Sequence, residues 1–540
     1  MKAELVLYNG HVYTMDPTRG RVGAVAVAGT IAGNRIAAVG DDAEMRALLG
    51  PGGQAIDLEG RAAMPGLIDA HVHFGWLSIA VSQARLDLDN VPTKAEAVAR
   101  VAERARELPP GRWILGGGWN QNVWPEPAMP TAADLDAVAP EHPVALKSKS
   151  YHATWANSRA LELAGITAAT EDPPGGQIVR GERGRPTGIL LENAAEMVDG
   201  AVPKPDVAET MVALRQGMAQ AHRLGLTGVH DPGQATVLAA LQALRAAGEM
   251  QMRVVMHLPA EDLEAAIELG LRSGLGDEWL RIGGVKLFAD GALGPQTAQM
   301  LAPYEGAAGN LGIPTLSRDE LHGLVRRANG AGLAVAVHAI GDAANRTALD
   351  AIAAAQANAA GPTRPALPNR IEHVQLLHPD DLPRLAELGV VASMQPIHAT
   401  SDMEMAERHW GRRCELAYAW NSLLGSGARL AFGSDSPVET LDPLAGIHAA
   451  VTRRRADGSP GPEGWIPAQR ITVAQAVHGY TLGAAYASGE AHLKGSLTPG
   501  KLADLVVLSH DIFQGPPEEI AAARVEMTVL DGRIVYVCPN

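Results

Sequence analysis

The chain has 540 residues and a mass of 56.5 kDa, which exceeds one ordinary domain but suits a barrel of about 250 residues with appended segments. Its 45 basic and 60 acidic residues give a formal net charge of −15, and no basic run is long, so nucleic acid and anionic membranes are not expected partners. A hydrophobic content of 46% argues against wholesale disorder, and two cysteines, Cys414 and Cys538, form no disulfide framework.

The N-terminus shows no signal-peptide pattern. Met1–Leu5 leads into Asn9-Gly10 before an apolar core develops, and no later window offers about 18 uninterrupted apolar residues. We therefore expect a soluble cytoplasmic protein without a membrane partner. We also expect a small-molecule substrate and a homo-oligomer, most simply a dimer.

Both ends of the chain contain short β-like runs, separated by Asn-Gly, Asp-Gly and other glycine-rich turns. These runs are Leu5–Tyr8, Ala24–Val27, Arg35–Val39, Leu502–Leu508 and Met527–Tyr536. We expect the two ends to pair into one small β-sandwich domain formed by residues 1–62 and 487–540.

Between the ends, apolar strands alternate with Ala/Leu-rich helical stretches, which is typical of a parallel sheet built from βα units. The predicted strands are Leu67–Phe74, Gly228–His230, Arg253–Met256, Gly284–Phe288, Leu333–His338, Arg370–Val374, Val390–Met394 and Arg429–Asp435. Eight such strands predict the α/β class and a (β/α)8 TIM-like barrel over residues 63–486.

The first and second predicted strands are separated by about 150 residues, far more than the usual loop of about 2 to 6 residues and one helix. The span contains strand-like Trp113–Gly116 and Val144–Lys147 and a helix-like stretch from Thr93 to Leu108. We predict an inserted α/β subdomain over residues 90–205, which would cover the barrel mouth.

Two histidines stand one residue apart in the first predicted strand. Side chains alternate faces along a strand, so His71 and His73 would project to the same side and could share one divalent metal ion. A lone His-x-His pair also occurs in hydrogen-bonded cores, so further ligands are needed.

Further ionisable residues lie at or near the C-terminal ends of the predicted strands, where barrel enzymes place their chemistry. Together with the first pair, the set is His71, His73, Lys286, His338, His373 and Asp435. Buried groups of this kind are costly unless they are paired or bind a metal, so their convergence predicts an ion or a charged network.

The motifs around these residues extend over nearly the whole chain. They are Pro65–His73, Val285–Gly291, Val337–Asp342, Ile371–His373, Phe432–Asp435 and Pro499–Val507. In this ordered set the chain resembles the metal-dependent amidohydrolase superfamily, amidohydrolase family 3, and within it the YtcJ-like branch that includes N-substituted formamide deformylase.

The resemblance implies a site with two zinc ions. His71 and His73 would bind one zinc, His338 and His373 a second, and Lys286, carboxylated on its amine, would bridge both. Asp435 would be a further ligand and the general base. The alternative is an uncarboxylated Lys286 paired with Asp290 beside a single metal, and another divalent metal could replace zinc.

The reaction implied by the resemblance is hydrolysis of a carbon–nitrogen bond other than a peptide bond, in an amide, N-acyl or N-formyl compound. Zinc lowers the pKa of bound water to about 7 and so supplies hydroxide, and Asp435 would pass the water proton to the leaving amine. The same site could act as an esterase, lactonase or deaminase. The alternative of another class is a non-catalytic scaffold.

One further histidine resembles a residue of this branch that reaches the site from the insertion. His152, in the stretch Tyr151–Ser158, could donate a hydrogen bond to the substrate carbonyl, or it could make a structural hydrogen bond. Gln296 stands where the branch frequently has an arginine, so we expect it to alter substrate preference.

Several other polar and aromatic residues have more general expected roles. Asp231 would support the barrel mouth, and Glu372 would face away from the barrel interior in a structural ion pair. Histidines such as His257 and His398 are expected at the surface or in hydrogen bonds. Aromatic residues could line a pocket for an apolar substituent or belong to the core: Trp76, Trp119, Trp124, Trp155 and Phe288.

Overall fold

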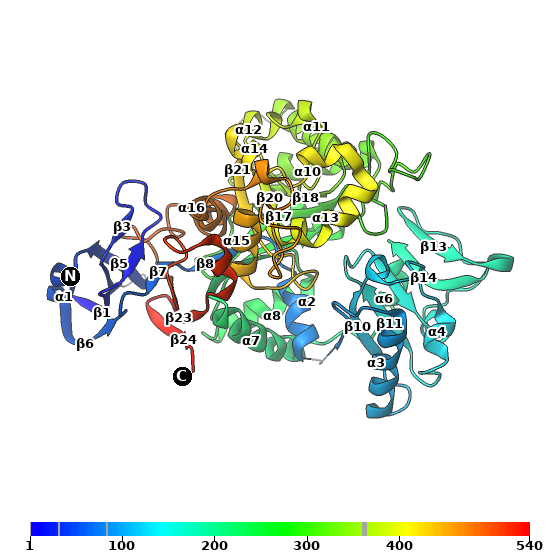
Figure 1. Cartoon of the computed structure of the whole chain (residues 1–540), viewed down its shortest axis with the longest axis horizontal. Helices are drawn as coiled ribbons and strands as arrows, with labels where there is room; N and C mark the ends of the chain where they lie inside the picture. Colours follow the sequence, from blue (N-terminus) through cyan, green and yellow to red (C-terminus); the bar gives the residue numbers. More distant parts are fainter. Residues whose placement is uncertain (1, 31–32, 83–84, 359–363, 540) are drawn as a thin grey trace.

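The computed structural model describes residues 2–30, 33–82, 85–358 and 364–539. Figure 1 shows three parts in a row, with a central barrel between a β-sandwich that holds both termini and a separate α/β unit. Within the described residues, no helix is both long and apolar enough to cross a membrane.

The central part is the predicted barrel. Eight strands follow one another in sequence order within one sheet, and each pairs in parallel with its neighbour. The first and last strands approach where the Ala70 amide donates to the Phe432 carbonyl over 2.9 Å. The strands are β8 (Leu67–Asp69), β15 (Leu226–Asp231), β16 (Arg253–Pro259), β17 (Leu280–Phe288), β18 (Val335–Ala339), β19 (Arg370–His373), β20 (Val391–Met394) and β21 (Arg429–Phe432).

Helices surround this sheet, as the alternation of apolar strands and helical stretches predicts. They include α2 (Phe74–Ser82), α7 (Val207–Arg223), α8 (Ala235–Ala246), α9 (Leu263–Glu268), α10 (Arg318–Gly330), α11 (Asp342–Asn358), α12 (Arg384–Glu387), α13 (Pro396–Trp410), α14 (Trp420–Gly425), α15 (Pro443–Thr452), α16 (Val473–His478) and α17 (Ala484–Ala487). The prediction of a TIM-like barrel is confirmed.

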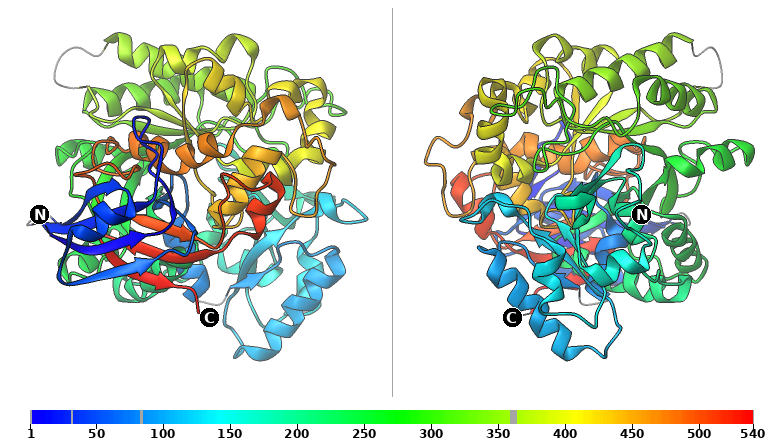
Figure 2. Two further views of the ribbon diagram at one scale, coloured as in Figure 1. Left: turned by 60° about the vertical axis from the view of Figure 1, so that its left-hand side comes forward. Right: turned by 90° about the vertical axis from the view of Figure 1, so that its right-hand side faces the viewer.

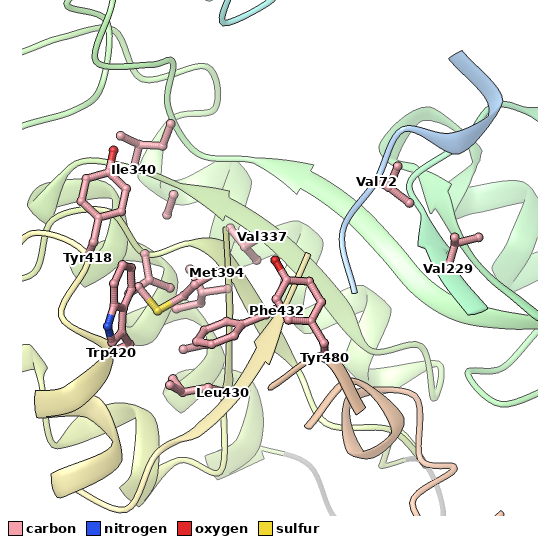
Figure 3. Close-up of a cluster of buried hydrophobic side chains, with 14 of the residues drawn as sticks. Val72, Val229, Val337, Ile340, Met394, Tyr418, Trp420, Leu430, Phe432 and Tyr480 are labelled. Carbon is pink, nitrogen blue, oxygen red and sulfur yellow. The ribbon is translucent and has the colours of Figure 1, made fainter. Parts of the chain in front are cut away.

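The largest apolar core lies between the barrel strands and these helices. Figure 3 shows part of it, with the Phe432 ring beside Tyr480 at 5.8 Å and Trp420 at 6.4 Å between ring centroids. Burying a large apolar side chain stabilises the fold by about 1.5 to 3 kcal/mol. This packing holds the strand ends, and therefore the residues that follow them, in fixed positions.

The first barrel strand is shorter than predicted. It ends at Asp69, whose carboxylate accepts the backbone N–H groups of His71, over 3.0 Å, and Ser434, over 3.1 Å. The chain then turns into α2 at Phe74. His71 and His73 therefore lie in a loop, and strand alternation does not explain why both face the same centre.

The sandwich consists of two sheets that enclose a separate apolar core. One sheet contains β1 (Ala3–Tyr8), β4 (Ala24–Thr30), β5 (Gly33–Gly40) and β6 (Leu49–Asp57). The other contains β2 (His11–Tyr13), β3 (Arg21–Val22), β7 (Ala62–Pro65), β22 (Leu505–Leu508), β23 (Val525–Leu530) and β24 (Arg533–Val537). The antiparallel pairing of β22 with β7 joins the two ends of the chain, which Figure 2 shows side by side.

The inserted unit has a six-stranded sheet with its own core. Helix α3 (Lys94–Glu107) begins after Thr93, whose hydroxyl accepts the Glu96 amide as an N-cap. The other helices are α4 (Ala132–Asp136), α5 (Ser158–Leu163) and α6 (Ala195–Asp199). The strands are β9 (Leu86–Asp87), β10 (Ile114–Trp119), β11 (Val144–Ser148), β12 (Ala153–Ala156), β13 (Gly176–Arg180) and β14 (Pro186–Glu192).

Candidate metal centre

The structure brings the six predicted residues to one end of the barrel. His71 and His73 follow β8, Lys286 lies in β17, His338 lies in β18, and His373 ends β19. Asp435 follows β21. All of them lie in the C-terminal halves of strands of one sheet or just after those strands, so their side chains converge on a common space.

Asp435 lies at the centre of this group. One of its oxygens, Oδ1, is 3.3 Å from His71 Nε2 and 3.2 Å from His73 Nε2, and Oδ2 is 3.9 Å from His373 Nδ1. Burial opposes its ionisation, but the close approach of His71 and His73 and the charge of His373 hold the pKa of Asp435 well below its ordinary value. The carboxylate is therefore ionised at neutral pH. Ligand atoms of His71, His373 and Asp435 all lie within 4.8 Å of one another, close enough for one metal ion.

His338 and Lys286 complete the group on the other side. The rings of His338 and His373 are 4.5 Å apart, and His338 Nε2 donates to the Gly291 carbonyl over 3.0 Å, which leaves Nδ1 with a lone pair. The Lys286 ammonium is buried 4.9 Å above the Phe288 ring. Burial, the largest effect, lowers the pKa of Lys286 to about 8.

Several atoms in this group are buried without a hydrogen-bond partner in the part of the chain that the structure describes: His71 Nε2, Lys286 Nζ and Asp435 Oδ1. Each such atom costs about 1 to 3 kcal/mol. Imidazole nitrogens and carboxylate oxygens are ligands for zinc and similar divalent ions, so a bound cation would satisfy them. An ammonium cannot bind a cation, whereas a carbamate on Lys286 could. The residues present therefore fit a metal centre.

Asp290 is not the partner of Lys286. Its carboxylate accepts backbone N–H groups from Ile340, over 3.0 Å, Gly341, over 2.9 Å, and Gln299, over 2.8 Å. These bonds occupy its oxygens and fix the loop after β18. Asp231, at the end of β15, likewise binds backbone: its carboxylate accepts the Gly75 N–H at the start of α2 over 3.0 Å.

Glu372 faces the barrel interior, so the prediction that it faces away was wrong. Its side chain is 1% exposed, and it accepts hydrogen bonds from Arg370 Nε and from His71 Nδ1. Strand alternation failed because the strand ends here: His373 has a φ of 74°, which turns its ring towards the same centre as the neighbouring Glu372. The carboxylate fixes His71 with its Nε2 lone pair directed at the centre.

His152 reaches the barrel mouth from the insertion. Its ring lies 5.2 Å from that of His338, and its Nδ1 is 2.6 Å from Glu192 Oε2. The second Glu192 oxygen accepts the Thr297 hydroxyl. Because Glu192 accepts a hydrogen bond from Nδ1–H, Nε2 is the ring nitrogen of His152 that is left for the site.

A cavity opens from this group towards the insertion. His152, His338, His373 and Asp435 line its inner end. Its other walls include side chains that the sequence analysis did not single out: Lys149, Gln375, Asp402 and Glu439.

His398 also lines the cavity, although it was expected to have a generic role. It is buried, its Nε2 is 3.6 Å from Asp435 Oδ2, and its ring stacks 6.0 Å from His373. The i,i+4 spacing of His398 and Asp402, directly after the seventh predicted strand, is the signal that could have identified both residues.

The predicted pocket aromatics lie in different places. Trp76 stacks on His73 with ring centroids 4.5 Å apart, and Phe288 is 41% exposed with its ring 5.2 Å from His338. Trp119 and Trp155 are both buried in the core of the insertion; Trp119 also borders the cavity, and Trp155 donates to the Thr131 carbonyl over 2.7 Å. Gln296 lies in the loop after β17, outside the residues that line the cavity.

Comparison with known proteins identifies relatives over the full length of the chain. The model of the amidohydrolase family matches residues 54–536. The protein Long After Far-Red 3 of Arabidopsis thaliana is 35% identical over 99% of this chain and 92% of its own length. YtcJ of Bacillus subtilis is 33% identical over 99% of both chains, and the N-substituted formamide deformylase of Arthrobacter pascens is 31% identical over 99% of this chain and 98% of its own.

A solved structure is also similar over most of the chain. A metal-dependent hydrolase of Pyrococcus horikoshii covers 95% of this chain and 99% of its own, with 29% identity and a TM-score of 0.76. The resemblance that the sequence motifs indicated is confirmed.

Proposed function

Because the chain belongs to the amidohydrolase family, we propose that it hydrolyses the carbon–nitrogen bond of a small amide, with an N-acyl or N-formyl amine as substrate. The observation that carries this proposal is the convergence on Asp435 of three histidines, at 3.2 to 3.9 Å, beside a buried Lys286. A full-length relative that is named for deformylation of N-substituted formamides supports the substrate class.

His71, His73, His338, His373 and Asp435 would hold one or two divalent ions, for which zinc is the first candidate. A divalent ion bound there polarises the substrate carbonyl and lowers the pKa of water to about 7. The lowered pKa of Lys286, about 8, leaves part of the amine neutral near pH 7. The neutral amine can add CO2 and lose a proton, which gives an anionic carbamate able to bridge two ions.

Asp435 is the base in this proposal. It is ionised, and it lies between the histidines and the cavity, so it can accept the proton of the attacking water. Cleavage of the carbon–nitrogen bond needs a proton on the leaving nitrogen, and Asp435 can deliver the one it has taken. The water oxygen stays on the acyl product.

His152 acts on the substrate carbonyl in this proposal. Burial opposes protonation of His152, but the charge of Glu192 and its hydrogen bond to Nδ1 outweigh this and raise the pKa of His152. The protonated ring then carries an Nε2–H that can donate to the oxygen that becomes negative as water adds. The insertion that supplies His152 also lines the cavity with Trp119 and Ala153, and so it limits access of bulk water.

The test is hydrolysis of a panel of N-formyl and N-acyl amines by protein purified without chelator, with esters and lactones of matched shape as controls. We expect amide hydrolysis that a chelator abolishes and that a divalent metal restores. Faster turnover of the esters or lactones would move the assignment to that chemistry. Activity that persists after complete removal of metal would contradict the metal-dependent mechanism. A folded protein that turns over no member of the panel would favour a scaffold role.

A further inference from the structure

The outer part of the cavity is formed by one face of helix α13. His398, Ser401, Asp402 and Met405 all line the cavity, at the i, i+3, i+4 and i+7 spacing of one helical stripe. His398 is nearest the catalytic carboxylate, at 3.6 Å from Asp435 Oδ2. Asp402 follows about one turn later, about 6 Å farther along the helix axis.

The carboxylate of Asp402 is poorly compensated. It accepts a hydrogen bond from the Tyr418 hydroxyl over 2.5 Å, and it forms no ion pair with any residue that the structure describes. Burial raises its pKa, against the favourable charge of His398. A partly buried carboxylate in this state is stabilised by a cation that enters the cavity.

Among the described residues that line the cavity, Lys149 is the one lysine or arginine, and its ammonium already pairs with two carboxylates. Its Nζ lies 2.8 Å from Asp89 and 3.2 Å from Glu439. Burial opposes its charge, but these two carboxylates outweigh that effect and raise its pKa. The cavity-lining carboxylates Asp402 and Glu439, with Asp89 paired to the same ammonium as Glu439, outnumber Lys149, so this end of the cavity carries a net negative charge when they are ionised.

A second observation points to a ligand that donates hydrogen bonds. Gln375 lines the cavity, and its Oε1 is buried without a partner among the described residues. Its amide nitrogen faces His398 Nδ1 over 3.2 Å, so Oε1 is the free acceptor. An N–H group of a ligand would satisfy it.

We propose that the outer end of the cavity binds the cationic end of the substrate, so that the enzyme acts on N-acyl derivatives of diamines or of similar amines with an ammonium or guanidinium group. This inference rests on the proposed amide hydrolysis. A spacer of about four or five single bonds, each about 1.5 Å, spans the helical turn between His398 and Asp402. A substrate carboxylate at this position would meet like charge.

Three formamides of similar length test the inference with the metal-loaded enzyme. They are N-formyl-1,4-diaminobutane, the neutral N-formylpentylamine and the anionic 4-formamidobutanoate. We expect kcat/KM for the ammonium compound to exceed that of the neutral compound by about tenfold or more, and the anion to be the poorest substrate. Asp402→Asn should lower the ratio of the cationic to the neutral compound towards one, whereas the exposed Asp319→Asn should not change it.

Two outcomes would overturn the inference while the proposed function survives. These are equal or faster hydrolysis of the neutral or anionic formamide, and a cationic preference that Asp402→Asn does not reduce. If none of the three is hydrolysed, amide hydrolysis of this class fails, and calorimetric titration with 1,4-diaminobutane and with the neutral 1-pentanol decides the inference separately. Binding of the diamine that Asp402→Asn weakens would support the cationic subsite, and no preference for the diamine would reject it.

Discussion

The Nδ1 atom of His71 lies 2.7 Å from Glu372 Oε2, and both side chains are buried inside the barrel, 3% and 1% exposed. Arg370 forms an ion pair with the same carboxylate and also bonds to the Ala70 carbonyl and the Ser393 hydroxyl. The charge of Arg370 and the bond to His71 hold the pKa of Glu372 well below its ordinary value, although burial opposes this. A fixed anion therefore determines the tautomer and orientation of His71.

We expect Glu372→Gln to weaken divalent-metal affinity by about 10- to 100-fold. The neutral amide is a weaker acceptor for the Nδ1–H of His71 than the carboxylate, so it orients the ring less firmly and makes Nε2 a weaker ligand. Competition with a chromophoric chelator measures the affinity directly. Glu387→Gln, on an exposed face of α12, is the matched control. An affinity equal to that of the unmodified protein would show that Glu372 serves only the internal ion pair.

We expect His152→Gln to lower kcat by about 100- to 1000-fold with little change in metal content, since it removes one donor to the developing oxyanion and no metal ligand. Steady-state kinetics and elemental analysis on the same preparation separate the two effects. The exposed His492→Gln serves as control. If His152→Gln loses metal in proportion to activity, the residue supports the centre and does not act on the substrate.

The sequence motifs located the barrel and six convergent residues because strand periodicity and strand-end chemistry are local signals. They did not show that β8 stops at Asp69, whose carboxylate binds the backbone of His71 and of the distant Ser434. The orientation of Glu372 was missed for a similar reason: the left-handed backbone of His373 is set by tertiary contacts.

Helix faces were harder to assign than strands. His398 and Asp402 face the cavity because α13 packs across the barrel mouth. Their i,i+4 spacing after the seventh strand indicates a shared helix face, but the packing of that face depends on tertiary contacts. Trp155 belongs to the core of the insertion because its indole N–H has a backbone acceptor there, a pairing that composition does not reveal.

A buried charge cluster gives the fold a defined acid sensitivity. Glu490 lies 2.8 Å from Lys494 and 3.2 Å from Arg281. Burial disfavours its ionisation, but Lys494 and then Arg281 outweigh this, and the pKa of Glu490 is lowered. The stability it contributes is therefore present above the unfolded pKa of about 4.3 and is lost as the pH falls through the folded pKa.

We expect Glu490→Gln to destabilise the protein by about 3 to 5 kcal/mol at pH 7, because the buried Lys494 and the partly buried Arg281 lose their anion. The variant should also lose less stability than the unmodified protein as the pH falls below about 4. Denaturant unfolding across this pH range measures both effects. Glu404→Gln, which removes an exposed pair with Arg455, should cost about 1 kcal/mol or less. Equal effects of the two substitutions would contradict the role assigned to Glu490.

The two cysteines should differ in reactivity. Cys414 is buried, and burial raises the pKa of its thiol to about 12, whereas Cys538 is partly exposed near the C-terminus. We expect a thiol reagent at pH 8 to modify Cys538 rapidly in the native protein and Cys414 only after denaturation. Modification of the native protein should leave its hydrolytic activity unchanged. Loss of activity on native modification would place a thiol near the site.

The most direct test of the account is the metal content per chain, by elemental analysis of protein purified without chelator, compared with Lys286→Ala and with His71→Ala combined with His73→Ala. Intact mass under native conditions checks for a carbamate on Lys286. We predict about two divalent ions per chain, falling to one or none in both variants. Metal content that is the same in all three proteins, or no bound metal in a protein that still hydrolyses its substrate, would contradict the metal centre proposed around Asp435.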